Sequence, residues 1–127
     1  MKLRIKGNSI RLRLTQSEVA EFARAGRVSD QLQFGPERAL VYALIRDASA
    51  ASIAARYAGD ELSVVVPLET ARTWTETEQV GFRGEITGAP DATVQILVEK
   101  DFQCLVPRPG EDEGDHYANP LATGKQI

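Results

Sequence analysis

The 127-residue sequence has little of the material for cross-links or metal clusters, since it contains one cysteine, Cys104, and one histidine, His116. A single cysteine excludes an intramolecular disulfide and any zinc site built from several cysteines, and it is typical of a reducing compartment. No apolar run approaches the ~20 residues of a membrane span, and the N-terminus lacks the apolar core of a signal peptide. We therefore expect a cytoplasmic protein that does not bind a membrane.

The sequence also lacks a recognisable catalytic signature. There is no phosphate-binding loop, no G-x-G-x-x-G and no H-E-x-x-H. Cys104 and His116 form the single pair available for Cys/His catalysis, but prolines separate them, and a free cysteine is usually a buried structural residue. We therefore expect a binding domain rather than an enzyme.

Length and composition are those of a small globular protein, with 43% hydrophobic and 26% charged residues. Apolar periodicity continues to residue 106 and stops at Pro107. We expect a single α+β domain over 1–106, followed by an acidic arm or tail containing proline and glycine over 107–127. The net charge of −3 disfavours nucleic acid as a partner unless a local basic patch binds it.

Residues 2–26 have the clearest local pattern. Apolar and basic residues alternate on both sides of Gly7-Asn8, a pair that permits a tight turn, which predicts a β-hairpin. Thr15 and Glu18 have the spacing of a helix capping box, and Gly26 ends the helix that follows. This stretch is therefore predicted to fold as β-β-α.

The remaining chain alternates in short segments joined by turns. The pattern predicts a helix over 68–77 and strands over 28–34, 40–45, 53–57, 62–66, 80–86 and 94–98. The resulting order is ββαββ-ββαββ, although no matching residues support a duplication. We expect about eight strands in a mainly antiparallel meander, barrel-like or stacked as a sandwich, with two short helices at its ends or on one face.

One face of the predicted hairpin carries five cations and no acid. These residues are Lys2, Arg4, Lys6, Arg11 and Arg13. Cations two apart on paired strands project side by side, which favours an anion-binding surface. The other interpretation is a solvated outer face whose charges prevent edge-to-edge pairing. We expect the face to bind a small anionic ligand or a protein partner.

The C-terminal segment is the second charged feature. Asp112, Asp115 and His116 have the oxygen and nitrogen ligands that a divalent metal ion would take, which suggests a metal-dependent hydrolase as an alternative function. The spacing does not match the 12-residue calcium loop. The other interpretation is a hydrated acidic tail that docks onto the basic hairpin.

The run from Gly7 to Leu14, followed by Ser17-Glu18-Val19-Ala20, resembles the start of swapped-hairpin antitoxins and transition-state regulators. In that family a Gly-Asn-Ser turn and a basic strand precede a short helix. The resemblance implies an intertwined homodimer that binds DNA, with Arg11, Arg13 and Lys6 as contacts. A DNA-binding regulator is therefore a further alternative.

The whole chain resembles a small family of uncharacterised bacterial proteins. The similar segments are MKLRIKGNSIRLRLTQSEV at the start, Glu78-Gln79-Val80-Gly81, and ILVEKDFQCL…ED…DHYANP near the end. This resemblance implies a bacterial cytoplasmic protein and assigns no activity.

Overall fold

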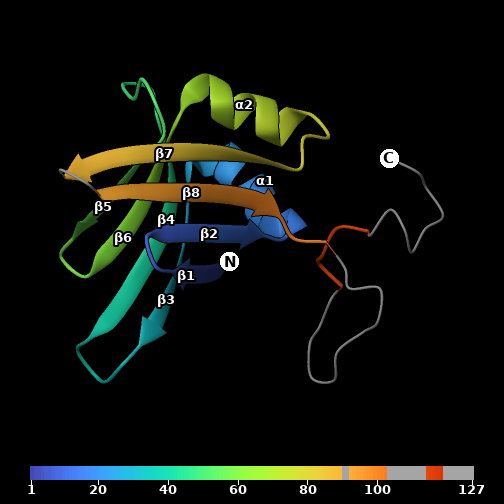
Figure 1. The fold of residues 1–127 in the computed structure, drawn as a ribbon. Helices are drawn as coiled ribbons and strands as arrows, with labels where there is room; N and C mark the ends of the chain where they lie inside the picture. Colours follow the sequence, from blue (N-terminus) through green and yellow to red (C-terminus); the bar gives the residue numbers. More distant parts are fainter. Residues whose placement is uncertain (90–91, 103–113, 119–127) are drawn as a thin grey trace.

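The computed structural model describes residues 1–89, 92–102 and 114–118. They form eight strands and two helices in the order ββαββ-ββαββ, which confirms the predicted α+β class (Figure 1). The first half contains β1 (Lys2–Lys6), β2 (Ser9–Leu14), α1 (Gln16–Ala25), β3 (Arg27–Gln33) and β4 (Ala39–Asp47). The second half contains β5 (Ala54–Ala58), β6 (Glu61–Pro67), α2 (Leu68–Glu76), β7 (Gly81–Ala89) and β8 (Ala92–Lys100).

The strands form two four-stranded sheets, each built from both halves of the chain. Sheet A has the order β1-β2-β8-β7, and sheet B has the order β3-β4-β6-β5. The outer pairs are antiparallel hairpins, whereas the central pairs β2–β8 and β4–β6 are parallel. The connections therefore differ from the expected meander. Each helix carries the chain from one sheet to the other, so the two hairpins of one half do not pair with each other.

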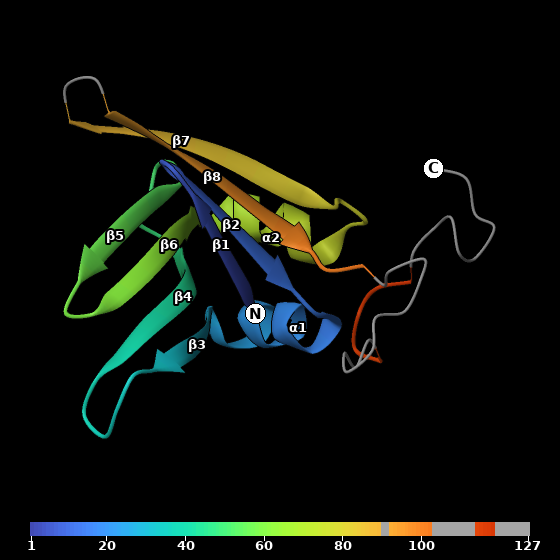
Figure 2. The same cartoon turned by 60° about the horizontal axis from the view of Figure 1, so that its bottom comes forward.

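The two sheets stack as a sandwich, and no ladder among the described strands closes them into a barrel. Both helices lie at one end, where Phe22 and Trp74 are fully buried. The Trp74 ring packs against Phe22 at 6.0 Å and Phe82 at 5.3 Å between centroids, in edge-to-face contacts. Away from the helices the sheets diverge, with β7 and β8 separating from the hairpins of sheet B (Figure 2).

The local signals in the first 26 residues produce the predicted β-β-α unit. Gly7 takes a φ of 53° in the β1–β2 turn, a conformation that glycine adopts without strain. The Glu18 carboxylate accepts a hydrogen bond from the Thr15 backbone N–H at 2.9 Å, as a capping box requires. Gly26 ends α1 with a φ of 75°, and its N–H donates to the Phe22 carbonyl at 2.8 Å.

The strand registers reveal an internal twofold repeat. Ser9 pairs with Gln95 in the centre of sheet A, and Glu61 pairs with Val41 in the centre of sheet B. Glu61 is thus equivalent to Ser9, 52 positions later, and Gln95 is equivalent to Val41, 54 positions later. The spacing changes because the connection from α2 to β7 is longer than the single Gly26 between α1 and β3.

Once the two spacings are applied, equivalent positions share chemistry. These pairs are Gly7/Gly59, Leu12/Val64, Leu14/Val66, Phe22/Trp74, Val28/Phe82, Leu44/Val98 and Asp47/Asp101. Most of them are buried core residues. The sequence prediction found no matching residues because no single spacing aligns both hairpins of each half.

Residues 114–118 pack beside α1 and the end of β8. The Gln16 N–H donates to the Asp115 carbonyl at 3.0 Å, and the Tyr117 N–H donates to the Asp101 carbonyl at 2.8 Å. The rings of Phe102 and Tyr117 lie 5.6 Å apart. The division into a domain over 1–106 and a tail over 107–127 stays a prediction. Neither described helix is long and apolar enough to span a membrane.

Candidate anion-binding face

The predicted basic residues all lie on the outer face of sheet A. Side chains alternate between the two faces of each strand. In β2, Leu12 and Leu14 therefore point into the core, whereas the cations of β1 and β2 point outward. The neighbouring strands add one further cation, Arg83 of β7, and two acids. We call this surface the basic face, and its charged residues are Lys2, Arg4, Lys6, Arg11, Arg13, Arg83, Glu85 and Glu99.

The registers align these side chains in rows across the sheet. The central row runs Arg4, Arg11, Leu97 and Arg83, and the next row runs Lys6, Ser9, Gln95 and Glu85. A concavity of about 230 Å³ lies over these two rows. We call it the basic hollow, and the cations that line it are Arg4, Lys6, Arg11 and Arg83.

The cations of the basic face differ in how far they are neutralised. Arg11 donates from Nε to the Glu99 carboxylate at 2.6 Å, and Arg13 Nε lies 3.8 Å from the same oxygen. By contrast, no described acidic residue forms an ion pair with Arg4, Lys6 or Arg83. Three of the four cations that line the hollow therefore have donors free for an anion.

Sequence reasoning missed Arg83, although a signal for it exists. In the predicted strand over 80–86, Phe82 faces the core, so alternation places Arg83 on the opposite face. The position of that face beside the hairpin depends on β8 pairing with both β2 and β7. Local pattern does not encode those long-range pairings.

The predicted metal ligands make other contacts. The Asp115 carboxylate accepts from the Ser17 backbone N–H at 3.2 Å and contacts the Ser17 hydroxyl, which places it at the N-terminus of α1. Hydrogen bonding from the Ser17 side chain holds the pKa of Asp115 below its usual value. Asp112 lies outside the described residues, which contain no group of three or more metal-ligating side chains. The metal site stays a prediction.

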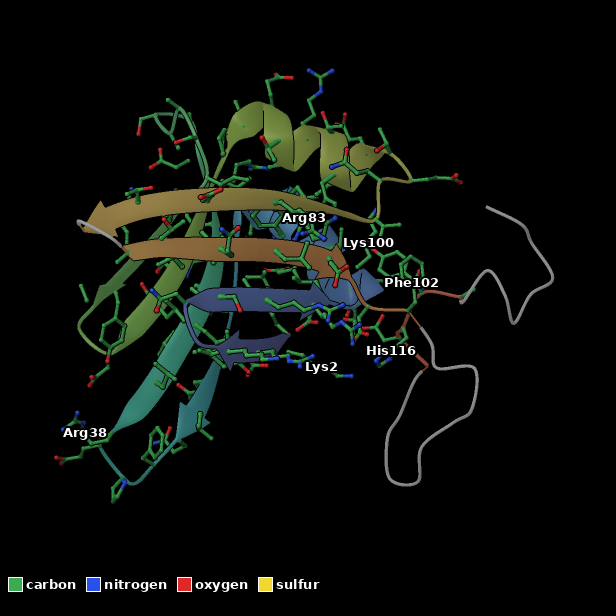
Figure 3. The ribbon with its side chains drawn as sticks, viewed as in Figure 1. Lys2, Arg38, Arg83, Lys100, Phe102 and His116 are labelled. Carbon is green, nitrogen blue, oxygen red and sulfur yellow. The ribbon has the colours of Figure 1, made fainter. Side chains whose placement is uncertain are left out.

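His116 lies beside Asp101 and Lys2 instead. Its Nε2 lies 3.0 Å from Asp101 Oδ2, and Lys2 Nζ lies 3.3 Å from the same oxygen (Figure 3). Asp101 is 3% exposed and His116 is 8% exposed. Neither ring nitrogen of His116 has a hydrogen-bond partner among the described residues, and the same holds for Asp101 Oδ2.

Two acids at the end of β8 and just after it contact the hairpin, whereas the docking of the acidic tail stays a prediction. Glu99 contacts Arg11, and Asp101 contacts Lys2. Residues 114–118 pack against α1 and the end of β8 rather than over the basic hollow. Residues 103–113 lie outside the described part of the chain.

The equivalent face of sheet B has a different character. The row equivalent to Arg4, Arg11, Leu97 and Arg83 reads Arg56, Ser63, Ala43 and Ser29. Ion pairs cross this face: Arg56 reaches Asp47 at 3.7 Å between Nη2 and Oδ2, and Arg27 contacts Glu61. The guanidinium of Arg27 holds the pKa of the Glu61 carboxyl below its usual value.

Fold and site together define a class: a two-sheet α+β domain of interleaved ββαββ units with a basic face on one sheet. The chain belongs to DUF7009, a family of unknown function, whose model matches residues 1–121. The match spans both halves and confirms the resemblance to an uncharacterised family; the bacterial origin stays a prediction. No curated protein and no solved structure matches the chain.

Proposed function

We propose that this protein is a non-enzymatic binding domain whose basic hollow takes an anionic group of a small ligand or of a protein partner. The observation that carries the proposal is that four cations from three strands line one concavity, and three of them have no acidic partner among the described residues. Two of these three, Arg4 and Arg83, lie in the same row of the sheet as Arg11.

The chemistry of the hollow suits a phosphate or a carboxylate. Arginine presents a planar fork of donors that matches either group, and such charge-assisted hydrogen bonds are stronger than neutral ones. The Ser9 and Gln95 side chains border the same concavity and supply neutral polar groups. Because the hollow is open to solvent, its interaction with an anion is screened by salt.

Calorimetric titration with inorganic phosphate and with pyrophosphate, at low and at physiological ionic strength, tests the proposal. Removing one charged hydrogen bond costs roughly 1.5–3 kcal/mol, so Arg4→Gln and Arg83→Gln are each expected to weaken binding about tenfold or more. The matched control is Arg56→Gln, because Arg56 is equivalent to Arg4 and is paired with Asp47 on sheet B. This control is expected to leave binding unchanged.

Two results would contradict the proposal. One is the absence of binding by either probe at low salt. The other is an equal loss of affinity in Arg4→Gln and Arg56→Gln. Equal losses would mean that anion affinity depends on the net charge of the protein and not on the residues of the hollow.

We infer a second candidate, a DNA-binding regulator, from the interleaved hairpins. In the swapped-hairpin family that the N-terminus resembles, two chains intertwine; here each sheet takes one hairpin from each half of a single chain. Such a protein would bind duplex DNA without the homodimer that the resemblance implies. Its affinity would fall with salt with a logarithmic slope of about 0.9 per phosphate neutralised, and indifference to duplex DNA at low salt would remove this candidate.

A further inference from the structure

An apolar groove opens between the two sheets at the end away from the helices. Its volume is about 390 Å³. We call it the wedge, and its apolar lining residues are Ile5, Ile10, Leu40, Tyr57, Leu62 and Val94. A second concavity of about 430 Å³ continues from it, sharing Leu40 and Tyr57 and adding Phe34. The two sheets diverge at this end (Figure 2), and the wedge lies between them.

Three large apolar side chains that line the wedge or the second concavity are exposed to an unusual degree. Phe34 is 70% exposed, Tyr57 is 68% exposed and Ile5 is 58% exposed. The hairpin pattern predicts that Ile5 faces the core with Leu3, so its exposure is a departure from that pattern. Exposed apolar residues that gather in a concavity mark binding sites more often than singly scattered ones do.

The wedge adjoins the basic hollow. Ser9 and Ile10 line both concavities, so the two lie on opposite sides of the tip of the β1–β2 hairpin. Lys6 of the hollow immediately precedes Gly7 of the wedge, and a Cβ at Gly7 would meet no atom within 4 Å. A molecule that passes around this open tip reaches the cations at one end and the apolar groove at the other.

The charges determine which end takes the head of such a molecule. Arg38 and Asp60, which line the second concavity, form an ion pair with 3.5 Å between Nε and Oδ2. Arg38 lies at the tip of the β3–β4 hairpin, far from the labelled Arg83 (Figure 3). In the basic hollow, by contrast, Arg4, Lys6 and Arg83 have no acidic partner among the described residues, so an anionic head belongs there and an apolar chain belongs in the wedge.

We infer that the ligand is a single-chain amphiphilic anion, such as an alkyl phosphate or a fatty carboxylate, bound as a free molecule. This inference rests on the proposed function, because the head group uses the basic hollow. The further element of the inference is that the wedge binds the apolar chain of the same ligand.

Calorimetric titration with inorganic phosphate, butyl phosphate and octyl phosphate, each below its micelle concentration, tests this inference. Burying one methylene group is worth up to about fourfold in affinity. Octyl phosphate is therefore expected to bind at least about tenfold more tightly than butyl phosphate. Octyl glucoside, which has the chain without the charge, is expected to bind far more weakly than octyl phosphate.

Two exposed positions separate the wedge from the hollow. Tyr57→Ser and Ile5→Ser are each expected to reduce the gain from butyl to octyl phosphate severalfold, while inorganic phosphate binds as before. The matched control is Leu32→Ser, because Leu32 is also exposed and apolar but lines neither concavity. Circular dichroism verifies that all three variants are folded.

The outcomes distinguish this inference from the proposed function. Phosphate binding without dependence on chain length would overturn the inference and leave the proposed function standing. Equal binding of octyl glucoside and octyl phosphate, or binding to anionic vesicles without binding of the monomers, would also overturn it. Failure of every probe, inorganic phosphate included, would count against the proposed function itself.

Discussion

The outer faces of the two sheets are the most informative comparison in this molecule. Both sheets have the same strand order and the same registers, so each position on one face has an equivalent on the other. Of the six cations on the outer face of sheet A, only Arg4 has a cationic equivalent, Arg56. The others correspond to Ala54, Ala58, Ser63, Val65 and Ser29.

This difference shows that the fold does not require the basic face. Sheet B forms the same structure with small neutral residues at most of these positions, and two arginines of its outer face, Arg27 and Arg56, pair with Glu61 and Asp47. Protection of a sheet edge does not explain the whole cluster either, because Arg11 lies on a central strand. The cations are therefore a feature of one of two equivalent sheets, which supports the proposed binding site.

The largest expected effect is a loss of stability when the aromatic core residue that the two halves share is truncated. Trp74 and Phe22 occupy equivalent, fully buried positions and contact each other. Trp74→Ala and Phe22→Ala are each expected to lower the free energy of unfolding by about 3–5 kcal/mol. Trp74→Ala should be the more costly, because its Nε1–H also donates to the Val80 carbonyl at 3.1 Å. Denaturant unfolding measures both, and a loss confined to one variant would break the equivalence.

A smaller effect is expected at the equivalent acids that follow the central strands. Asp101 is buried beside His116 and Lys2, whereas Asp47 is more exposed and bonds to Ser49. Asp101→Ala removes the carboxylate that lies 3.0 Å from Nε2 of the buried His116, and we expect the free energy of unfolding to fall by about 1–3 kcal/mol. Asp47→Ala should cost less. Chemical denaturation of both variants checks the order, and a larger loss at Asp47 would contradict the account.

The smallest expected effect is a change in phosphate affinity when an arginine of either outer face is released from its ion pair. Glu99→Gln releases Arg11 from its ion pair, and an exposed or half-buried pair is worth about 0.2–1 kcal/mol. Phosphate binding is therefore expected to tighten by up to about fivefold. The matched variant Glu61→Gln releases Arg27 on sheet B and should not change phosphate affinity. Equal tightening in both variants would show that only net charge matters.

Much of the fold follows from local pattern. Alternation predicted the strands, and the spacing of Thr15 and Glu18 predicted the start of α1. The parallel central pairs and the interleaving of the halves were not predictable in this way. They depend on contacts between segments far apart in the sequence, which the period of a single strand does not encode.

The site was predictable to a similar extent. The five cations of the hairpin were found by alternation and share one face, whereas Arg83 and the wedge depend on how the strands assemble. Ile5 illustrates the limit: its pattern indicates burial, but the divergence of the sheets leaves it exposed. Local pattern gives the side of a strand on which a residue lies, and packing decides what covers that side.

The central claim is that anion binding belongs to sheet A and not to its structural equivalent. The most direct test is a titration of the ¹⁵N-labelled full-length chain with inorganic phosphate, followed by amide chemical shifts. The account predicts saturable shifts at Arg4, Arg11, Leu97 and Arg83, with none at the equivalent Arg56, Ser63, Ala43 and Ser29. Comparable shifts in both rows, or none in either, would contradict it.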